Sequence, residues 1–343
     1  MRVFLTGGSG LLGGYIAERL VAEGCTLVAL VRPHSPLAQL HACGATLHLG
    51  DLRDPASLAH GMRGCDAVVH MASPKGGWKR PEAYAQHAVA GTHHLLAAMA
   101  ASGIRPLVHI STISVHGLDP LTAMVDDDSP FGQRFLPYDH YGRAKVAVER
   151  LVAAAQRAGV VEATVLRPGW IYGPGDRRNY GRLAARLRRG VLPCVGDGTN
   201  QIPLVYGPNV AGAVWHALAR PAASYRVVIY ASDGAITQRD LRASLERAAG
   251  VRLPTRQIPQ AALLGLAAAQ EQLSVWAGYR LPVLVTRYFL HLIGSDWRFA
   301  QRRLSDDLDY RPEVPIHEGL ARSEAWYRRD ASADSGQLYL SPA

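Results

Sequence analysis

The sequence lacks the cysteine patterns that form disulfides or metal sites, and it lacks the long apolar runs that cross a membrane. Its cysteines show no Cys-x-x-Cys pair and no metal-ligand spacing, and there are four of them: Cys25, Cys43, Cys65 and Cys194. Because disulfide scaffolds and structural zinc sites need such spacing, we expect reduced cysteines and no metal site. Long apolar runs are also missing, since the most apolar later stretch, residues 261–269, ends at Gln270 and Glu271, far short of the ~20 residues that cross a bilayer. We expect no transmembrane segment, while peripheral membrane contact stays open.

We also expect no signal peptide. The first ten residues, MRVFLTGGSG, reach glycines before they build the apolar run of about 7–15 residues that such a peptide needs. This stretch instead fits a first β-strand. We therefore expect a cytoplasmic protein.

Lysine is nearly absent. Of the 37 basic residues only three are lysines, at Lys75, Lys79 and Lys145. The formal net charge of +9 would allow nucleic-acid binding, but the one dense basic cluster, residues 182–190, mostly fits the solvated side of a helix. We expect a small-molecule substrate and no nucleic-acid partner.

Short runs rich in Val, Leu and Ile alternate with longer helical patterns. The expected strands are RVFLT, TLVALV, ATLHLG, AVVHMA, PLVHIS, ATVLRPG and YRVVIYAS. Helices are expected over residues 10–23, 55–63, 81–102, 140–158 and 209–219. This alternation predicts an α/β fold in which a doubly wound parallel sheet of the Rossmann type carries helices on both faces.

The pattern changes along the chain and predicts two regions. A dinucleotide-binding Rossmann domain is expected over residues 1–175, with residues 205–233 returning to it. A smaller, mainly helical substrate-binding region is expected from residues 176–204 and 234–330. Residues 331–343 are expected to form a loose tail.

A glycine motif follows the first expected strand and opens the first expected helix. Gly7, Gly10 and Gly13 have the spacing G-x-x-G-x-x-G. Glycines at this place let the backbone approach a pyrophosphate at the helix N-terminus, where free N–H groups and the helix dipole favour an anion. The motif predicts a dinucleotide cofactor.

The end of the second strand indicates which cofactor. Val31 stands where a carboxylate would bind the ribose 2′-hydroxyl of NAD, and Arg32 follows it directly. Because an arginine there can pair with a 2′-phosphate, NADP(H) is favoured over NAD(H). Asp51 ends the third strand, where an adenine edge would lie. The segment HMAS, which closes with Ser73, ends the fourth strand beside the pyrophosphate and ribose.

The rare lysine at position 145 follows Tyr141 by four residues, so that both side chains share one helical face. A phenol, with a reference pKa of ~10, becomes a useful base when a nearby ammonium stabilises the phenolate. The compact charge of lysine can also hold a ribose hydroxyl. Ser111 and Thr112 end the fifth strand upstream, at the sheet edge where ligands of such folds bind.

Together these motifs resemble the extended short-chain dehydrogenase/reductase family. The resemblance covers roughly residues 1–330 and lies in the N-terminal glycines, GDLRDPASL, GCDAVVHMAS, STISVHG, Tyr-x-x-x-Lys and LRPGWIYGPGD. It implies hydride transfer between a nicotinamide and a carbinol carbon, with Tyr141 as general acid/base, Lys145 lowering its pKa and Thr112 hydrogen-bonding the substrate oxygen. It implies cofactor contacts from Gly7, Gly10, Leu11, Leu12, Gly13, Arg32, Asp51, Leu52, Ala72, Ser73, Ser111, Tyr141, Lys145, Pro168 and Ile171. Family members commonly pair their long helices, so we expect a homodimer.

The C-terminal half is similar to the 3β-hydroxysteroid dehydrogenase-like branch, which includes 2-alkyl-3-oxoalkanoate reductases, and LVRPHS is similar to dihydroflavonol reductases. That likeness implies a bulky, largely apolar ketone or alcohol as substrate. The apolar stretches within residues 258–293 fit a pocket, a lid, a dimer contact or a membrane contact. A nucleotide-sugar epimerase or dehydratase that retains its nicotinamide is the alternative enzyme. A non-catalytic NADP-sensing protein is the alternative of another class.

Two positions depart from the family pattern. Ala88 stands where the family commonly has asparagine in its fourth helix, which puts a proton relay there in doubt. His116 stands where the family usually has tyrosine, and we expect it to be a packed imidazole rather than a catalytic group.

Overall fold

The computed structural model describes residues 1–74, 78–221, 224–252, 254 and 256–333 of the 343-residue chain. The chain forms two compact units. Unit 1 consists of Met1–Gly169, Gly207–Ala231 and Arg298–Glu313. Unit 2 consists of Trp170–Tyr206, Ser232–Trp297 and the chain from Val314 onward.

Unit 1 is built on a seven-stranded sheet with the order β10-β6-β5-β4-β1-β2-β3, in which all neighbours pair in parallel. The strands are β1 (Arg2–Thr6), β2 (Thr26–Val31), β3 (Thr46–Leu49), β4 (Ala67–His70), β5 (Pro106–Ile110), β6 (Glu162–Pro168) and β10 (Arg226–Tyr230). These are the seven runs expected from the sequence. The predicted doubly wound Rossmann sheet is therefore confirmed.

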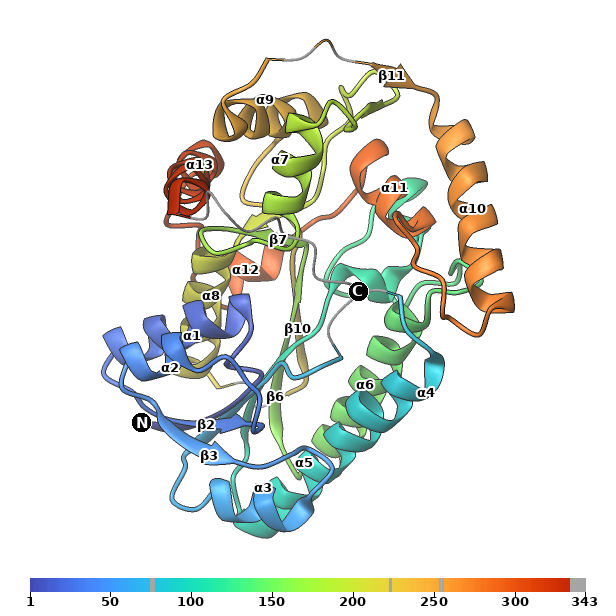
Figure 1. Ribbon diagram of the computed structural model, residues 1–343. Helices are drawn as coiled ribbons and strands as arrows, with labels where there is room; N and C mark the ends of the chain where they lie inside the picture. Colours follow the sequence, from blue (N-terminus) through green and yellow to red (C-terminus); the bar gives the residue numbers. More distant parts are fainter. Residues whose placement is uncertain (75–77, 222–223, 253, 255, 334–343) are drawn as a thin grey trace. The chain divides into compact units, whose positions relative to one another are not determined.

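Helices lie on both faces of this sheet, as Figure 1 shows. One layer contains α1 (Leu11–Ala22), α2 (Ala38–Ala42) and α8 (Gly207–Ala219). The other contains α3 (Pro55–Gly61), α5 (Ala90–Ser102) and α6 (His140–Arg157). Between the second layer and the sheet lies an apolar core that includes Phe4, Val68, Leu107 and Val165. Burial of each large apolar side chain contributes roughly 1.5–3 kcal/mol, so continuous apolar strands favour a sheet covered on both faces.

Side-chain caps fix where two of these helices begin. Asp54 accepts hydrogen bonds from the backbone N–H groups of Ala56 and Ser57, and Pro55 occupies the first turn of α3. Asp139 accepts a hydrogen bond of 2.8 Å from the Gly142 N–H at the start of α6. Such caps satisfy N–H groups that have no partner within the helix. The Asp139 cap therefore sets the position of Tyr141 in the first turn of α6.

The segment predicted as one helix over residues 81–102 contains a widened turn. α4 (Pro81–Tyr84) is followed by a π-helical turn at Ala85–Val89, and α5 follows directly. Ala88 lies in this turn, and its carbonyl accepts a hydrogen bond of 2.7 Å from the Thr92 hydroxyl. Such turns insert one extra residue and are frequent at functional sites. The sequence of residues 81–102 carries no local signal for this insertion.

The last part of unit 1, Arg298–Glu313, comes from the region predicted to belong to the substrate-binding part. It includes α12 (Arg302–Asp306). The Asp127 carboxylate accepts hydrogen bonds from the backbone N–H of Arg303 at 3.0 Å and from that of Ile229 at 2.7 Å. The Tyr310 hydroxyl donates to the Asn209 carbonyl at 2.7 Å. These contacts join segments far apart in the sequence, so local pattern could not place them.

Unit 2 is mainly helical. Its helices are α7 (Tyr180–Arg188), α9 (Gln238–Ala249), α10 (Gln260–Trp276), α11 (Arg287–Gly294) and α13 (Ile316–Ala333). Two short parallel pairs join β7 (Trp170–Tyr172) to β9 (Leu204–Tyr206) and β8 (Cys194–Val195) to β11 (Gln257–Ile258). α9 packs against both α7 and α13 around an apolar core.

The tail expected from residue 331 is described only in part. α13 continues to Ala333, so residues 331–333 are helical, and residues 334–343 lie outside the described residues. Over the described part of the chain, no helix combines the length and the apolar character needed to cross a bilayer.

Candidate functional site

The candidate site lies at the carboxyl edge of the unit 1 sheet. The chain runs outward from β1 through β2 to β3, and then continues on the other side of β1 with β4. Ligands of open parallel sheets bind where the strand order reverses in this way. The loop after β1 carries Gly7, and the loop after β4 carries Ala72 and Ser73, so the two loops flank the reversal.

The glycine loop is packed too tightly for side chains at two positions. Gly7 has a φ of +79°, and a Cβ on it would lie 2.7 Å from Met71 Cγ. A Cβ on Gly13 would lie 2.3 Å from the Gly7 carbonyl oxygen, so the first turn of α1 sits directly against the loop. Gly10 caps α1 without a side chain, and the first turn, which begins with Leu11 and Leu12, holds no acidic residue. The N–H groups of that turn are therefore available to an anion.

The loop after β4 is held beside the glycine loop. The Thr6 hydroxyl oxygen accepts hydrogen bonds of 3.3 Å from the backbone N–H groups of Met71 and Ala72. The Ser73 hydroxyl is buried and has no hydrogen-bond partner among the described residues. A ligand hydroxyl or phosphate oxygen would satisfy it. The glycine loop and the unpaired Ser73 hydroxyl together fit the pyrophosphate and ribose of a dinucleotide.

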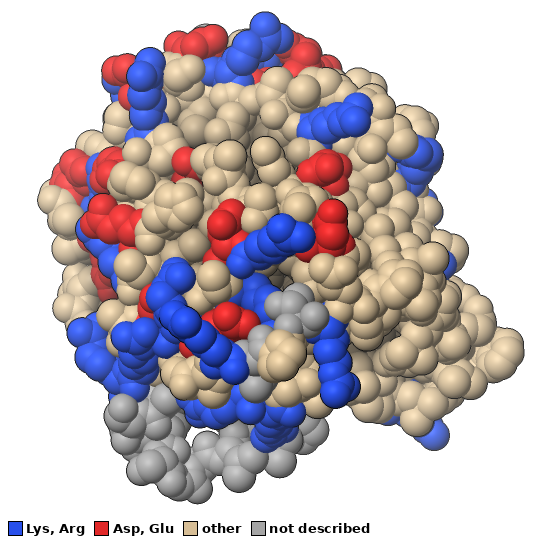
Figure 2. All heavy atoms as spheres, turned by 90° about the horizontal axis from the view of Figure 1, so that it is seen from above, with Lys and Arg blue, Asp and Glu red and all other residues tan. Residues whose placement is uncertain are grey.

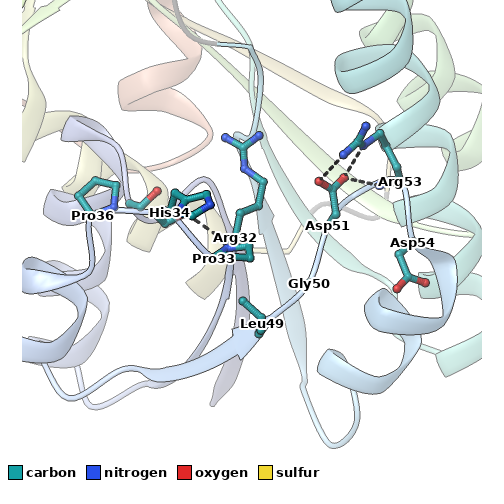
Figure 3. A pocket seen from close by; sticks show the side chains of 11 residues that line it. Arg32, Pro33, His34, Pro36, Leu49, Gly50, Asp51, Arg53 and Asp54 are labelled. Carbon is teal, nitrogen blue, oxygen red and sulfur yellow. Dashed lines mark hydrogen bonds and ion pairs between the residues drawn. The ribbon is translucent and has the colours of Figure 1, made fainter.

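A pocket of about 630 Å³ opens beyond the ends of β2 and β3, and Figure 3 shows it from close by. Its lining residues are Ser9, Arg32, Pro33, His34, Ser35, Pro36, Leu49, Gly50, Asp51, Arg53 and Asp54. The Ser35 hydroxyl accepts a hydrogen bond of 3.1 Å from the Arg32 N–H. The exposed Arg32 guanidinium stands apart in Figure 3 and has no ion-pair partner among the residues that the structure describes. It can therefore meet an incoming anion without breaking a contact.

The Asp51 carboxylate in this pocket is already paired. Its two oxygens accept hydrogen bonds from the Arg53 Nε at 3.0 Å and from a terminal guanidinium nitrogen at 3.1 Å. The Arg53 hydrogen bonds hold the pKa of Asp51 below its usual range. The sequence analysis did not single out Arg53. Its guanidinium offsets the negative charge of Asp51, and the Asp54 carboxylate caps α3. Among the described residues that line the pocket, Arg32 is the arginine without an ion-pair partner.

The three residues predicted to act in catalysis come together in unit 1. Tyr141 and Lys145 lie on α6, and Thr112 follows β5. The Thr112 side chain hydrogen-bonds the Tyr141 phenol. Lys145 is only 5% exposed, and its ammonium donates to the Ile110 carbonyl at 2.9 Å. The Tyr84 ring lies 6.1 Å from the Tyr141 ring, between centroids.

Burial shifts both titrating groups of this set. It raises the pKa of Tyr141 to about 12, although the hydrogen bond from Thr112 opposes the rise. It lowers the pKa of Lys145 to about 8, and the negative charge of Glu149 opposes that fall. The protonated phenol is the form that donates a proton to a carbonyl oxygen. Burial, Thr112 and Asp139 set the Tyr141 pKa here, so the predicted stabilisation of the phenolate by Lys145 stays a prediction.

A buried ionic network lies one helical turn beyond Lys145. Glu149 is fully buried and pairs with Arg167, whose side chain is 4% exposed, at 2.7 Å. The Ser111 hydroxyl donates to the Glu149 carboxylate. Arg167 donates to His116 Nε2 at 3.0 Å, and burial lowers the pKa of His116 to about 3. The network ties α6 to the ends of β5 and β6, which carry the predicted nicotinamide-side residues.

Two buried histidines lie close to Lys145 in unit 1. The His70 ring is held between the hydroxyls of Thr6, at 2.7 Å, and Thr92, at 3.0 Å. The His109 ring lies 5.2 Å from the His70 ring, between centroids. Burial, aided by the Lys145 charge, lowers the pKa of His70 to about 3 and that of His109 well below its usual value. Both imidazoles are therefore neutral, and the positive charge of this region belongs to Lys145.

The remaining predicted residues are placed as follows. Leu52 is buried, and a Cβ on Gly91 would lie 3.0 Å from its Cβ. Pro168 is the last residue of β6 in unit 1, and Ile171 lies on β7 in unit 2. Ser111 uses its hydroxyl within the buried network. Sequence reasoning missed Glu149, although its position four residues after Lys145 on the same helical face was a usable signal.

The sequence matches the NAD dependent epimerase/dehydratase family over residues 3–230. The chain belongs to this family. It is 34% identical over 332 residues to a 2-alkyl-3-oxoalkanoate reductase of Stenotrophomonas maltophilia, which covers 95% of this chain and 99% of that protein. It is 30% identical over 326 residues to a farnesylated quinoline-oxide ketoreductase of Stigmatella aurantiaca, which covers 93% of this chain and 95% of that protein.

Solved structures of this family share the fold. A UDP-glucose 4-epimerase of Thermus thermophilus in complex with NAD superposes with a TM-score of 0.72 and 22% identity, and covers 96% of this chain and 99% of that chain. The family member described here is an NAD(P)-dependent oxidoreductase of the extended short-chain dehydrogenase/reductase type. In the part of the chain that the structure describes, no three His, Cys, Asp or Glu side chains gather in a way that could hold a metal ion.

Proposed function

We propose that the protein is an NADP(H)-dependent ketoreductase that interconverts a bulky, largely apolar ketone and its secondary alcohol. The observation that carries the proposal is that Thr112, Tyr141 and Lys145 lie at the same edge of the sheet as the glycine loop. Two relatives of at least 30% identity whose names describe reductases of carbonyl compounds support the reaction type.

A bound nicotinamide supplies the hydride that reduces the carbonyl carbon. Tyr141 donates its phenolic proton to the carbonyl oxygen. Burial raises the pKa of Tyr141, so the phenol is protonated before the reaction. Thr112 orients the substrate oxygen through its hydroxyl. Lys145 holds a ribose hydroxyl and favours the phenolate that forms. The buried Glu149–Arg167 pair fixes the helix that carries both groups.

Arg32 supports the choice of cofactor. Its guanidinium has no ion-pair partner among the described residues, and Val31 leaves the strand end without a carboxylate that would repel a 2′-phosphate. A charge-assisted contact contributes roughly 1.5–3 kcal/mol, which is about tenfold to over a hundredfold in affinity. NADPH as cofactor makes ketone reduction the physiological direction.

Epimerisation or dehydration of a nucleotide sugar is the second candidate function. The fold shared with a UDP-glucose 4-epimerase in complex with NAD favours it. That reaction needs a clamp for a sugar diphosphate, for which Arg177 and Arg178 are the candidate cations. Arg177 is paired with Asp330. A guanidinium with that partner is less free to bind a diphosphate, so the reductase is the better supported function.

A substrate panel tests the proposal. The purified protein is mixed with NADPH and, in turn, with a 2-alkyl-3-oxoalkanoate, a 3-ketosteroid, a flavonoid ketone and a UDP-sugar. Oxidation of NADPH by one or more of the apolar ketones is expected. Conversion of the UDP-sugar without net consumption of NADPH would instead assign the second function.

The shifted pKa of Lys145 leads to a pH prediction. Because the ammonium is the form that binds ribose, kcat/KM for NADPH is expected to fall as the pH rises through about 8, the pKa of Lys145 in the free protein. Glu149→Gln removes the charge that favours the ammonium, so the fall should begin at lower pH. Glu162→Gln is the matched control, since Glu162 pairs with Arg105 at the surface. Identical pH profiles for all three proteins would contradict this role of Glu149.

Titration with both cofactors tests Arg32. The unmodified protein is expected to bind NADPH about tenfold to a hundredfold more tightly than NADH. Arg32→Ala should weaken NADPH binding and leave NADH binding almost unchanged, and Val31→Asp combined with Arg32→Ala should turn the preference toward NADH. His34 and Ser35 also line the pocket and can share the phosphate, which would reduce the effect of the single substitution. Equal affinities of the unmodified protein for NADH and NADPH would show that Arg32 is only a solvated arginine.

A further inference from the structure

Helix α10 in unit 2 is apolar on two opposite faces. Its inner face packs against α11 and β8 through Leu263, Leu264 and Ala267. Its outer face presents Ala262, Leu266, Ala269, Leu273 and Trp276, at successive spacings of four and three residues. A helix with one solvent-exposed face ordinarily carries polar side chains on that face. Exposure of the apolar outer face of α10 to water is therefore unfavourable.

Several large apolar side chains on the outer face of α10 are exposed. Leu266 is 58% exposed, Leu273 is 52% exposed and Trp276 is 76% exposed. The segment after α10 adds Leu281, at 48%, and Leu284, at 68%. These seven residues, Ala262, Leu266, Ala269, Leu273, Trp276, Leu281 and Leu284, are called the α10 patch. Figure 2 shows few charged side chains on the right-hand side of the face it draws, where α10 lies in Figure 1.

The exposed charges of the segment that contains α10 have one sign. Residues 252–295 contain four arginines and a single acidic residue, Glu271. Glu271 is 3% exposed and pairs with Arg287 at 2.7 Å. The exposed charges of this segment are those of Arg252, Arg256 and Arg280, which lie before and after α10. Exposed arginines thus precede and follow helix α10 in the sequence, and this segment has no exposed carboxylate.

This charge pattern distinguishes two occupants of the α10 patch. A second copy of α10 would bring arginines against arginines at both ends of an antiparallel pair, without a carboxylate to meet them, and like charges across an interface weaken it. An anionic lipid surface offers the opposite charge to the arginines and an apolar layer to Leu and Trp. Tryptophan is enriched at the membrane–water interface. We propose that the α10 patch docks the protein peripherally on an anionic phospholipid bilayer.

Docking of this kind goes beyond the proposed reduction. The arginines would lie at the level of the lipid phosphates, and the Leu and Trp side chains would enter the boundary of the acyl region. The helix would lie along the surface rather than cross it, in agreement with the finding that no described helix is suited to span a bilayer.

Vesicle co-sedimentation tests the proposal with the full chain. Vesicles of phosphatidylcholine alone are compared with vesicles in which part of the lipid is phosphatidylglycerol. The unmodified protein should sediment with the anionic vesicles at low salt, and Leu273→Glu/Trp276→Glu should bind them at least about tenfold more weakly, since two apolar side chains no longer enter the lipid. Met124→Glu is the matched control, because Met124 is 63% exposed in unit 1 and lies outside the α10 patch.

A charge variant and a mass measurement complete the test. Arg256→Glu/Arg280→Glu should remove the preference for anionic vesicles, and high salt should do the same for the unmodified protein through screening. Circular dichroism of each variant checks that it is folded. The proposal is overturned if the unmodified protein stays in the supernatant with anionic vesicles, or binds both vesicle types equally. It is also overturned if Leu273→Glu/Trp276→Glu lowers the mass by light scattering without any vesicle binding, because a second copy would then cover the patch.

Discussion

Tyr141→Phe is expected to lower kcat for ketone reduction by about 10²–10⁴-fold, the usual cost of losing a general acid. The phenol is the proton donor in the proposed reaction, and the substituted ring keeps its place against Tyr84 because only the hydroxyl is removed. Affinity for NADPH should change little. Steady-state kinetics and a cofactor titration on the same preparation measure both quantities.

Lys145→Ala is the informative comparison for that substitution. Its ammonium is proposed both to hold the ribose and to favour the phenolate, so cofactor affinity and kcat should fall together. Turnover of Tyr141→Phe near the unmodified rate would contradict the proton-donor role of Tyr141. A Lys145→Ala protein with normal NADPH affinity would contradict the contact with ribose.

Glu149→Ala is expected to lower the free energy of unfolding by about 3–5 kcal/mol. The substitution leaves the Arg167 guanidinium, whose side chain is 4% exposed, without its carboxylate, and it also removes the acceptor of the Ser111 hydroxyl. A loss of this size should lower the midpoint of thermal unfolding by roughly 6–20 °C. Calorimetry or circular dichroism measures it.

The surface pair of Arg105 and Glu162 is the control for that stability effect. Its two side chains are 56% and 29% exposed, and exposed pairs contribute about 0–1 kcal/mol. Glu162→Ala should therefore shift the midpoint little. Equal shifts for Glu149→Ala and Glu162→Ala would show that the buried network does not stabilise unit 1.

The sequence predicts the sheet of unit 1 well because most strands there are short, mainly apolar runs between turn residues. It also predicts the glycine loop, since a φ of +79° at Gly7 and the close approach of Gly13 to the loop leave glycine as the fitting residue. The short strands of unit 2 escape prediction. β8 and β11 contain two residues each and pair across a long stretch of sequence, so no local periodicity marks them.

The candidate site is predictable where its residues lie in one motif and not where they meet through the fold. Tyr141 and Lys145 share one helical face, which the spacing of four residues already shows. The contacts of Lys145 with the Ile110 carbonyl and of Glu149 with Arg167 depend on how α6 packs on the sheet. The widened turn at Ala85–Val89 and the pairing of Asp51 with Arg53 likewise have no sequence signature.

The transfer of deuterium from C4-deuterated NADPH is the most direct test of the proposed reduction. The protein is incubated with this cofactor and a 2-alkyl-3-oxoalkanoate, and the product is analysed by mass spectrometry. The proposal predicts a 3-hydroxy product that carries the deuterium on its carbinol carbon. An unchanged ketone, together with epimerisation of a nucleotide sugar by the same preparation without cofactor consumption, would contradict it.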